Sequence, residues 1–156
     1  MAELLLDKGE IVVATARNPS DLDDLKANYS ASQLHVLKLD VHNLSEVKNA
    51  FTEAKKAFGR VDVVFNNAGW AIVGDLEATP EDEARKMFDT NFWSAANISL
   101  EAVRFFREEN KPCGGLLLTN ASQAGLSPVP GFGYYTASKH GAFFFIPLQW
   151  TFLIVI

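Results

Sequence analysis

The feature that most constrains the fold is an alternation of short β-rich apolar runs with longer segments of helical periodicity. Short runs of Val, Ile and Leu are typical of strands, whereas apolar residues three and four apart are typical of helices. Strands that alternate with helices imply an α/β fold, in which a parallel sheet carries helices on both faces. The predicted strands are 10–15, 34–39, 61–65 and 115–119, and the predicted helices are 45–58, 80–109 and 134–146.

Local signals define the ends of these helices. Gly59 is expected just beyond the end of the first, because glycine adopts the left-handed conformation that closes many helices. Thr79 is predicted to cap the second, with Pro80 in its first turn. Pro147 should break the third.

Composition excludes several classes of function. With 156 residues, one domain is expected, and a net charge of −5 gives no basic surface for nucleic acid or an anionic membrane. Cys113 is the only cysteine, so an intrachain disulfide is impossible and a reducing, cytoplasmic compartment fits. The first ten residues do not resemble a secretory signal. The three histidines are not at metal-ligand spacing, so we expect no metal and read them as surface or loop residues.

Polar or small residues follow all four predicted strands, at the edge where open α/β sheets bind ligands. They are Arg17, Asp40-Val41, Asn66-Asn67-Ala68-Gly69 and Asn120-Ala121-Ser122. In a dinucleotide site, an Arg after the strand suits a 2′-phosphate, whereas an acid suits the ribose hydroxyl. Any single one of these groups could also be an ordinary turn, and Arg17 a solvated surface residue.

A second polar group lies near the C-terminus of the chain. Tyr135 and Lys139 are four residues apart, hence on one face of the predicted helix. A free phenol, with a pKa of about 10, is a poor acid–base catalyst near neutrality, but a nearby ammonium favours the phenolate. Ser122 lies at a strand end, where its hydroxyl could polarise a carbonyl, and we expect Asn91 to begin the long helix that backs this site.

Together these residues resemble the short-chain dehydrogenase/reductase family, over residues 1 to about 141. The NNAG of 66–69 is similar to that family's structural motif, and Tyr135 and Lys139 match its YxxxK. Ser122 and Asn91 match the other two members of its catalytic tetrad. The resemblance implies a Rossmann-like, doubly wound parallel sheet.

The resemblance also implies a reaction, in which a carbonyl is reduced or a secondary alcohol oxidised. Tyr135 would exchange a proton with the reacting oxygen, and Ser122 would hydrogen-bond that oxygen. Lys139 would favour the phenolate and hold the nicotinamide ribose, and Asn91 would support a water relay to Lys139. The cofactor would be NADP(H) rather than NAD(H), because Arg17 occupies the position at which members of this family select NADP. The other cofactor-binding residues it implies are Asp40, Val41, Asn67, Ala68 and Gly69.

The sequence departs from the family pattern in two places. No glycines fall at the TGxxxGxG spacing of the family's phosphate loop, so the first strand and that loop are expected to be missing. That strand would be central, between 10–15 and 61–65, which must then close on each other, leave a gap or expose edges. Residues 142–156 form an atypical apolar tail in place of the family's last strands. We expect no membrane span there, but a strand over 150–156.

Three functional interpretations remain open. The chain could be an oxidoreductase of this family. It could instead be a fragment that binds cofactor poorly, and such a fragment would be inert or would associate with a full-length relative. A homo-oligomer would form through the helices at 80–109 and 134–146. An epimerase or dehydratase sharing YxxxK is disfavoured by the NNAG motif. The missing segments leave the substrate undefined.

Overall fold

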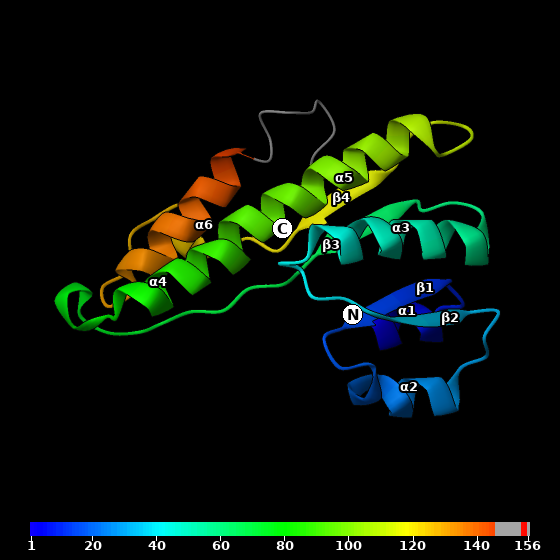
Figure 1. Ribbon diagram of the computed structural model, residues 1–156, viewed down its shortest axis with the longest axis horizontal. Helices are drawn as coiled ribbons and strands as arrows, with labels where there is room; N and C mark the ends of the chain where they lie inside the picture. The colour runs from blue at the N-terminus through cyan, green and yellow to red at the C-terminus, as the bar shows by residue number, and fades with distance from the viewer. Residues whose placement is uncertain (146–153, 156) are drawn as a thin grey trace. The chain divides into compact units, whose positions relative to one another are not determined.

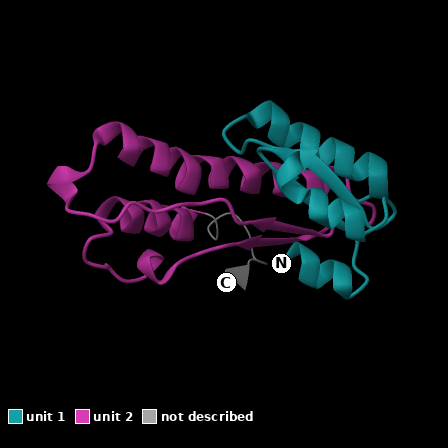
Figure 2. Cartoon of the chain, turned by 90° about the horizontal axis from the view of Figure 1, so that it is seen from below, with its two compact units in different colours: residues 1–61 teal, residues 62–156 magenta. Residues whose placement is uncertain are grey.

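The computed structural model describes residues 1–145 and the backbone of residues 154–155. The chain divides into two compact units, residues 1–61 and residues 62–156, which Figure 2 colours separately. Each unit has its own sheet, and each is considered by itself.

The first unit is built on two parallel strands, β1 (Val12–Ala16) and β2 (Leu34–Lys38), with Val12 opposite Leu34. Its core contains Leu6, Val12, Ala14 and Leu34. The prediction for Gly59 is confirmed, because it has a φ of 85° and its N–H donates to Lys55 O at the end of α3. The helical elements of this unit are α1 (Ala2–Asp7), the 3₁₀ turn η1 (Pro19–Leu22), α2 (Asp23–Asn28) and α3 (Leu44–Phe58).

The second unit carries a parallel sheet in the order β3-β4-β5. Helix α5 packs against β3 and β4, and α6 packs against α4, as Figure 1 shows. Met87, Ala102, Phe105 and Leu117 are buried in its core. The strands are β3 (Val63–Asn66), β4 (Leu116–Thr119) and β5 (Ile154–Val155). The helices are α4 (Glu81–Phe88), α5 (Ala95–Glu108) and α6 (Gly133–Phe145), with 3₁₀ turns at η2 (Leu76–Ala78) and η4 (Gln123–Gly125).

The helix predicted over 80–109 is present, but its interior is not regular. Between α4 and α5 the backbone forms a π-helical segment, η3 (Asp89–Ser94). The prediction that Asn91 begins the long helix is therefore wrong, since Asn91 lies within this segment. The predicted cap is also wrong: Pro80 is the N-cap of α4, and the Thr79 hydroxyl donates instead to Asp75 O, four residues back. That local bond competes with capping, as threonine hydroxyls often do.

The prediction of an α/β fold with parallel strands is confirmed, and so is an incomplete sheet. The described strands form two separate sheets, with β1 in one and β3 in the other. In the tail, Ile154 and Val155 pair with Leu118 and Thr119 of β4, as part of the predicted strand. Residues 146–153, Pro147 among them, and residue 156 lie outside the described part of the chain. Within that part, no helix combines the length and apolar character that crossing a membrane requires.

Candidate active site in the second unit

The centre of the candidate site is the side chain of Asn91, which is only 2% exposed. Its amide oxygen accepts a hydrogen bond from the Trp70 N–H (3.0 Å), and its amide nitrogen donates to Trp70 O (2.8 Å). The same nitrogen also donates to the Ser138 hydroxyl at 3.1 Å. Ser138 in turn donates to Tyr135 O at 2.8 Å. Asn91 thus links the segment after β3 to the first turns of α6.

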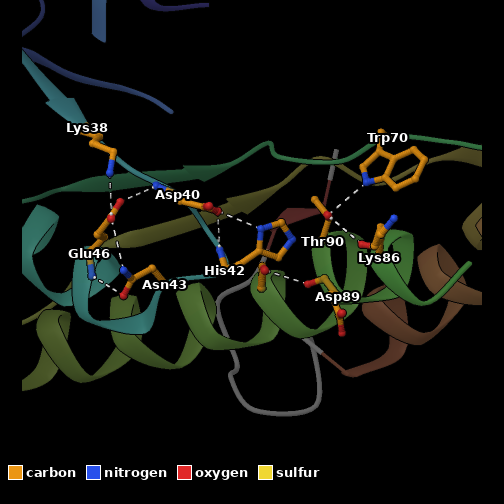
Figure 3. Close-up of polar contacts among 10 residues, drawn as sticks. Lys38, Asp40, His42, Asn43, Glu46, Trp70, Lys86, Asp89 and Thr90 are labelled. Atoms are coloured by element: carbon orange, nitrogen blue, oxygen red, sulfur yellow. Dashed lines mark hydrogen bonds and ion pairs between the residues drawn. The ribbon is translucent and has the colours of Figure 1, made fainter. Parts of the chain in front are cut away.

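The π-helical segment that carries Asn91 is held by hydroxyl groups. The Ser94 hydroxyl donates to Asp89 O at 2.7 Å, which is five residues back and so spans the widened turn. Thr90 Oγ1 donates to Lys86 O at 3.0 Å and accepts from the Trp70 indole N–H at 3.1 Å, as Figure 3 shows. π-Helical turns of this kind are frequent at functional sites.

Lys139 projects from α6 into the same region and is 8% exposed. Its Nζ donates to Asn120 O at 3.0 Å, just beyond the end of β4. It also lies 5.9 Å from the centroid of the Tyr135 ring. Burial lowers the pKa of the Lys139 ammonium below its ordinary value, because the charged form loses solvation. The predicted Tyr–Lys pair therefore shares one helix face, with the lysine in the interior.

Gly69 completes this cluster because its lack of a side chain makes room for the others. A Cβ atom at this position would lie 3.1 Å from Asn91 Oδ1 and 3.2 Å from Lys139 Nζ. The three residues come from a loop, a π-helical turn and a helix, and their close approach leaves little space for a side chain at residue 69.

The two asparagines before Gly69 fix the end of β3. The Asn66 side chain is buried and donates to Ala95 O at 3.0 Å, which ties β3 to α5. Asn67 Oδ1 accepts from the Asn120 side chain at 2.9 Å, which joins the ends of β3 and β4. The predicted residues Asn67, Ala68 and Gly69 thus lie beside the loop that follows β4.

A small cavity of about 10 Å³ lies among these elements, large enough for about one water molecule. Its polar lining comes from Asn66, Asn91, Thr119, Asn120 and Lys139. Among the residues that the structure describes, Thr119 Oγ1 is buried with no hydrogen-bond partner.

Ser122 caps the short turn η4, where its hydroxyl accepts from the Ala124 N–H at 3.2 Å. That turn packs on α6: a Cβ atom at Gly125 would lie 3.2 Å from Lys139 O. Ser122 therefore belongs to a turn that packs on α6, and its own hydroxyl makes a local contact.

The remaining predicted cofactor residues, Arg17, Asp40 and Val41, lie in the first unit, where they follow β1 and β2. Asp40 Oδ1 accepts from the His42 N–H (3.0 Å) and contacts His42 Nδ1 (2.9 Å), as Figure 3 shows. The His42 backbone N–H, then the imidazole, hold the pKa of the Asp40 carboxyl below its usual range, and the charge of Arg17 acts in the same direction. The Asp40 N–H donates to Glu46 Oε2 at 2.8 Å.

Sequence reasoning missed three residues that organise these sites: Trp70, Ser138 and His42. Ser138 is fully buried, although its sequence position between Tyr135 and Lys139 suggested only a helical spacer. His42 follows Asp40 by two residues, the spacing at which an aspartate commonly accepts from the backbone, and this signal could have been used. Nothing in the sequence marked Trp70 as the partner of Asn91.

Known proteins are similar to this chain both in sequence and in fold. A family model described as short chain dehydrogenase matches residues 1–147. An uncharacterized oxidoreductase of Schizosaccharomyces pombe is 40% identical over 134 residues, which is 86% of this chain and 44% of that protein. The chain therefore spans less than half the length of this relative.

Solved structures share the fold of this chain. A short-chain dehydrogenase from Streptomyces avermitilis superimposes with a TM-score of 0.80 at 31% identity, over 90% of this chain and 50% of that one. ElxO with NADP bound superimposes with a TM-score of 0.80 at 26% identity, over 90% of this chain and 56% of that one.

Proposed function

Because this chain belongs to the short-chain dehydrogenase family, an oxidoreductase family, we propose that it serves NADP(H)-dependent reduction of a carbonyl or oxidation of a secondary alcohol. The observation that supports this best is the convergence of Gly69, Asn91 and Lys139 beside Tyr135. The chain spans about half the length of its relatives, so the activity is a proposal for the protein to which these residues belong.

Tyr135 is the proposed acid–base residue. In the reductive direction, the carbonyl carbon gains a hydride and the carbonyl oxygen gains the proton of the Tyr135 hydroxyl. In the oxidative direction, the phenolate takes the proton from the alcohol. Lys139, buried and 5.9 Å from the ring centroid, stabilises negative charge on the phenol in either direction.

Ser122 and Asn91 are proposed to support this transfer. The Ser122 hydroxyl would donate its proton to the reacting oxygen while it accepts from the Ala124 N–H, because a hydroxyl can donate and accept at once. Asn91 holds the segment that carries Gly69 and lines the small cavity together with Lys139. One water in that cavity would relay protons to Lys139.

The residues present fit the nicotinamide end of the cofactor. An ammonium has three protons, and Asn120 O accepts one from Lys139, so the others are available to ribose hydroxyls. Gly69 allows a backbone approach that a side chain would block. When bound, NADPH supplies the hydride and is oxidised to NADP⁺.

At the adenine end, Arg17, Asp40 and Val41 are the proposed contacts, and Arg17 favours the 2′-phosphate of NADP(H). The NADP bound to the related ElxO supports this choice. An Arg17→Ser variant should lose at least tenfold in affinity for NADPH while keeping its affinity for NADH. An equal loss for both cofactors would contradict the assignment.

The test of the proposed function is a titration of NADPH against the purified chain, followed by tryptophan fluorescence. Trp70 is the natural reporter, since its backbone is bonded to Asn91. The proposal is supported if NADPH causes a saturable change in the fluorescence of the parent chain. That change should be absent in Trp70→Phe and present in Trp93→Phe. Absence of saturable binding below millimolar NADPH favours the alternative, a chain impaired in cofactor binding.

Two further proposals concern partners and location. We propose a homo-oligomer through the helices at 80–109 and 134–146, because Trp93, Leu100 and Phe144 expose large apolar side chains there. Light scattering should give a dimer or larger species that Leu100→Glu dissociates, and a monomer would contradict the proposed oligomer.

The proposed location is a reducing cytoplasmic compartment, which suits the single, exposed cysteine, Cys113. Cell fractionation would test this location.

A further inference from the structure

Two segments border the Asn91–Lys139 cluster and lie against each other. The first follows Gly69 and runs from Trp70 into η2, and the second, residues 126–132, leads into α6. The Gly74 N–H donates to Gly131 O at 2.8 Å. The side chain of Leu76 packs directly on Gly133, where it occupies the space of a Cβ atom. The two segments therefore form one continuous surface at the start of the helix that carries Tyr135.

The side chains that these segments expose are mostly apolar. Val73 is 67% exposed, Leu76 55% and Leu126 63%. Trp70, bonded to Asn91, is 36% exposed. The ring of Phe132 lies 5.8 Å from the ring of Tyr135, centroid to centroid. Both segments thus carry exposed apolar side chains, and Phe132 places an aromatic ring beside the proposed acid–base residue.

This surface also contains almost no charge. Residues 63–74 and residues 114–138 include no Asp, Glu, Lys or Arg. The next residue, Lys139, is buried and hydrogen-bonded to Asn120 O, and the charges at Asp75 and Glu77 are negative. An anionic ligand would therefore lose its hydration without gaining a counter-ion from these segments, which is costly.

We infer that the substrate of the proposed reaction is an uncharged, largely apolar ketone or secondary alcohol. Trp70, Val73 and Phe132 would contact its hydrocarbon part, while Tyr135 contacts its oxygen. This inference rests on the proposed function for the choice of reacting group. Its physical basis is that the burial of each CH₂ group against apolar side chains is favourable, so a chain of several carbons gives substantial affinity.

A matched pair of ligands tests the inference: 2-decanone and 9-oxodecanoate, which share a methyl ketone and a chain length but differ in a terminal carboxylate. Binding to the full chain is measured by tryptophan fluorescence and by ligand-observed NMR, with and without NADP⁺. We expect the neutral ketone to bind at least tenfold more tightly. Equal or tighter binding of the carboxylate, or no binding of either ligand up to its solubility limit, would overturn the inference.

Charge substitutions locate the effect. Val73→Lys and Leu126→Lys should weaken 2-decanone binding and narrow or reverse the preference. Val63→Lys, at a 52% exposed position on β3, is the matched control and should leave the preference unchanged. These results count only for variants whose circular dichroism matches that of the parent chain. The inference would also be overturned if Val73→Lys and Leu126→Lys left the preference unchanged, or if Val63→Lys altered it. Because ligand binding is scored without turnover, the two proposals can fail separately. If the neutral ketone binds but NADPH does not, the proposed function is rejected, while the preference of this surface for a neutral apolar ligand is kept.

Discussion

The side-chain amide of Asn91 pairs with both backbone groups of Trp70, accepting from its N–H at 3.0 Å and donating to its carbonyl oxygen at 2.8 Å. An amide side chain thereby satisfies both hydrogen-bonding groups of the Trp70 backbone. The segment that begins at Gly69 is fixed at the point where it passes Lys139. Asn91 has a structural role that can be separated from any part in proton transfer.

Replacing Asn91 by Leu should therefore destabilise the fold. Loss of the amide removes two part-buried hydrogen bonds to the N–H and C=O of Trp70, each of which contributes about 0.5–1.5 kcal/mol. Urea unfolding followed by circular dichroism measures the loss. Asn49→Leu, at an exposed position on α3, is the control and should change stability by less than about 0.5 kcal/mol. Equal stability of the two variants would contradict the structural role.

Gly69→Ala should disturb the cluster, whereas Gly74→Ala should not. The new Cβ atom at Gly69 would crowd Asn91 Oδ1 and Lys139 Nζ, and overpacking of this kind costs about 1–3 kcal/mol. Nothing lies within 4 Å of a Cβ atom at Gly74, and its φ is not positive. The melting temperature and the affinity for NADPH should both fall in Gly69→Ala and stay unchanged in Gly74→Ala. A harmless Gly69→Ala would show that the close approach is not required.

Lys139→Met should stabilise the fold at pH 7 while abolishing the proposed chemistry. Burial lowers the folded-state pKa of Lys139. Between that value and the ordinary value of about 10.4, the unfolded chain binds more protons, so stability rises with pH; below it, the folded chain bears the full cost of a buried ammonium. Methionine removes that cost.

Thermal scans from pH 6 to 10 measure this effect. The melting temperature of Lys139→Met should exceed that of the parent chain at pH 7, and the difference should shrink as the pH rises toward 10. Lys56→Met, at an exposed position, is the control and should be nearly neutral. A lower melting temperature for Lys139→Met at pH 7 would contradict the assignment of burial as the dominant effect.

His42→Ala should raise the pKa of the Asp40 carboxyl toward its ordinary value of about 3.9. The imidazole contact is lost, but the backbone N–H of residue 42 remains, so the rise should be partial. Because the folded-state pKa is depressed, the stabilisation is present above about pH 3.9 and is lost as the pH falls through the folded value. NMR titration of the Asp40 carboxyl carbon measures the shift, with His140→Ala as the control. An unchanged titration would exclude the imidazole as a cause.

The alternation of strands and helices could be predicted because apolar periodicity is a local property of the sequence. The same holds for the end of α3, since glycine is the residue that most readily adopts the left-handed conformation found at Gly59. The prediction that Thr79 caps α4 is wrong because its hydroxyl has two possible local partners, an N–H in the first turn of the helix and the carbonyl oxygen of Asp75. The sequence does not indicate that the bond to Asp75 O forms instead. The π-helical segment at Asp89–Ser94 could not be predicted, because nothing in the sequence indicates that the Ser94 hydroxyl will donate to Asp89 O, five residues back.

The candidate site divides in the same way. Tyr135, Lys139 and the NNAG residues were identified by their chemistry and spacing, and three of them do converge: Lys139 lies by the Tyr135 ring and against Gly69. The contribution of Ser138 was hidden, since a buried serine that bridges two elements looks like any other helical serine in sequence. The cofactor residues of the first unit remain predictions.

The most direct test of the proposed function uses the two adjacent tyrosines of α6. The rate of NADPH oxidation in the presence of a neutral ketone is compared for the parent chain, Tyr135→Phe and Tyr134→Phe. Each substitution removes one hydroxyl and keeps the ring, and Tyr134 is exposed at the helix surface. General acid catalysis contributes about 10²–10⁴-fold, so Tyr135→Phe should lose at least a hundredfold while Tyr134→Phe keeps the parent rate. Measurable turnover that is equal in all three chains would contradict the role of Tyr135.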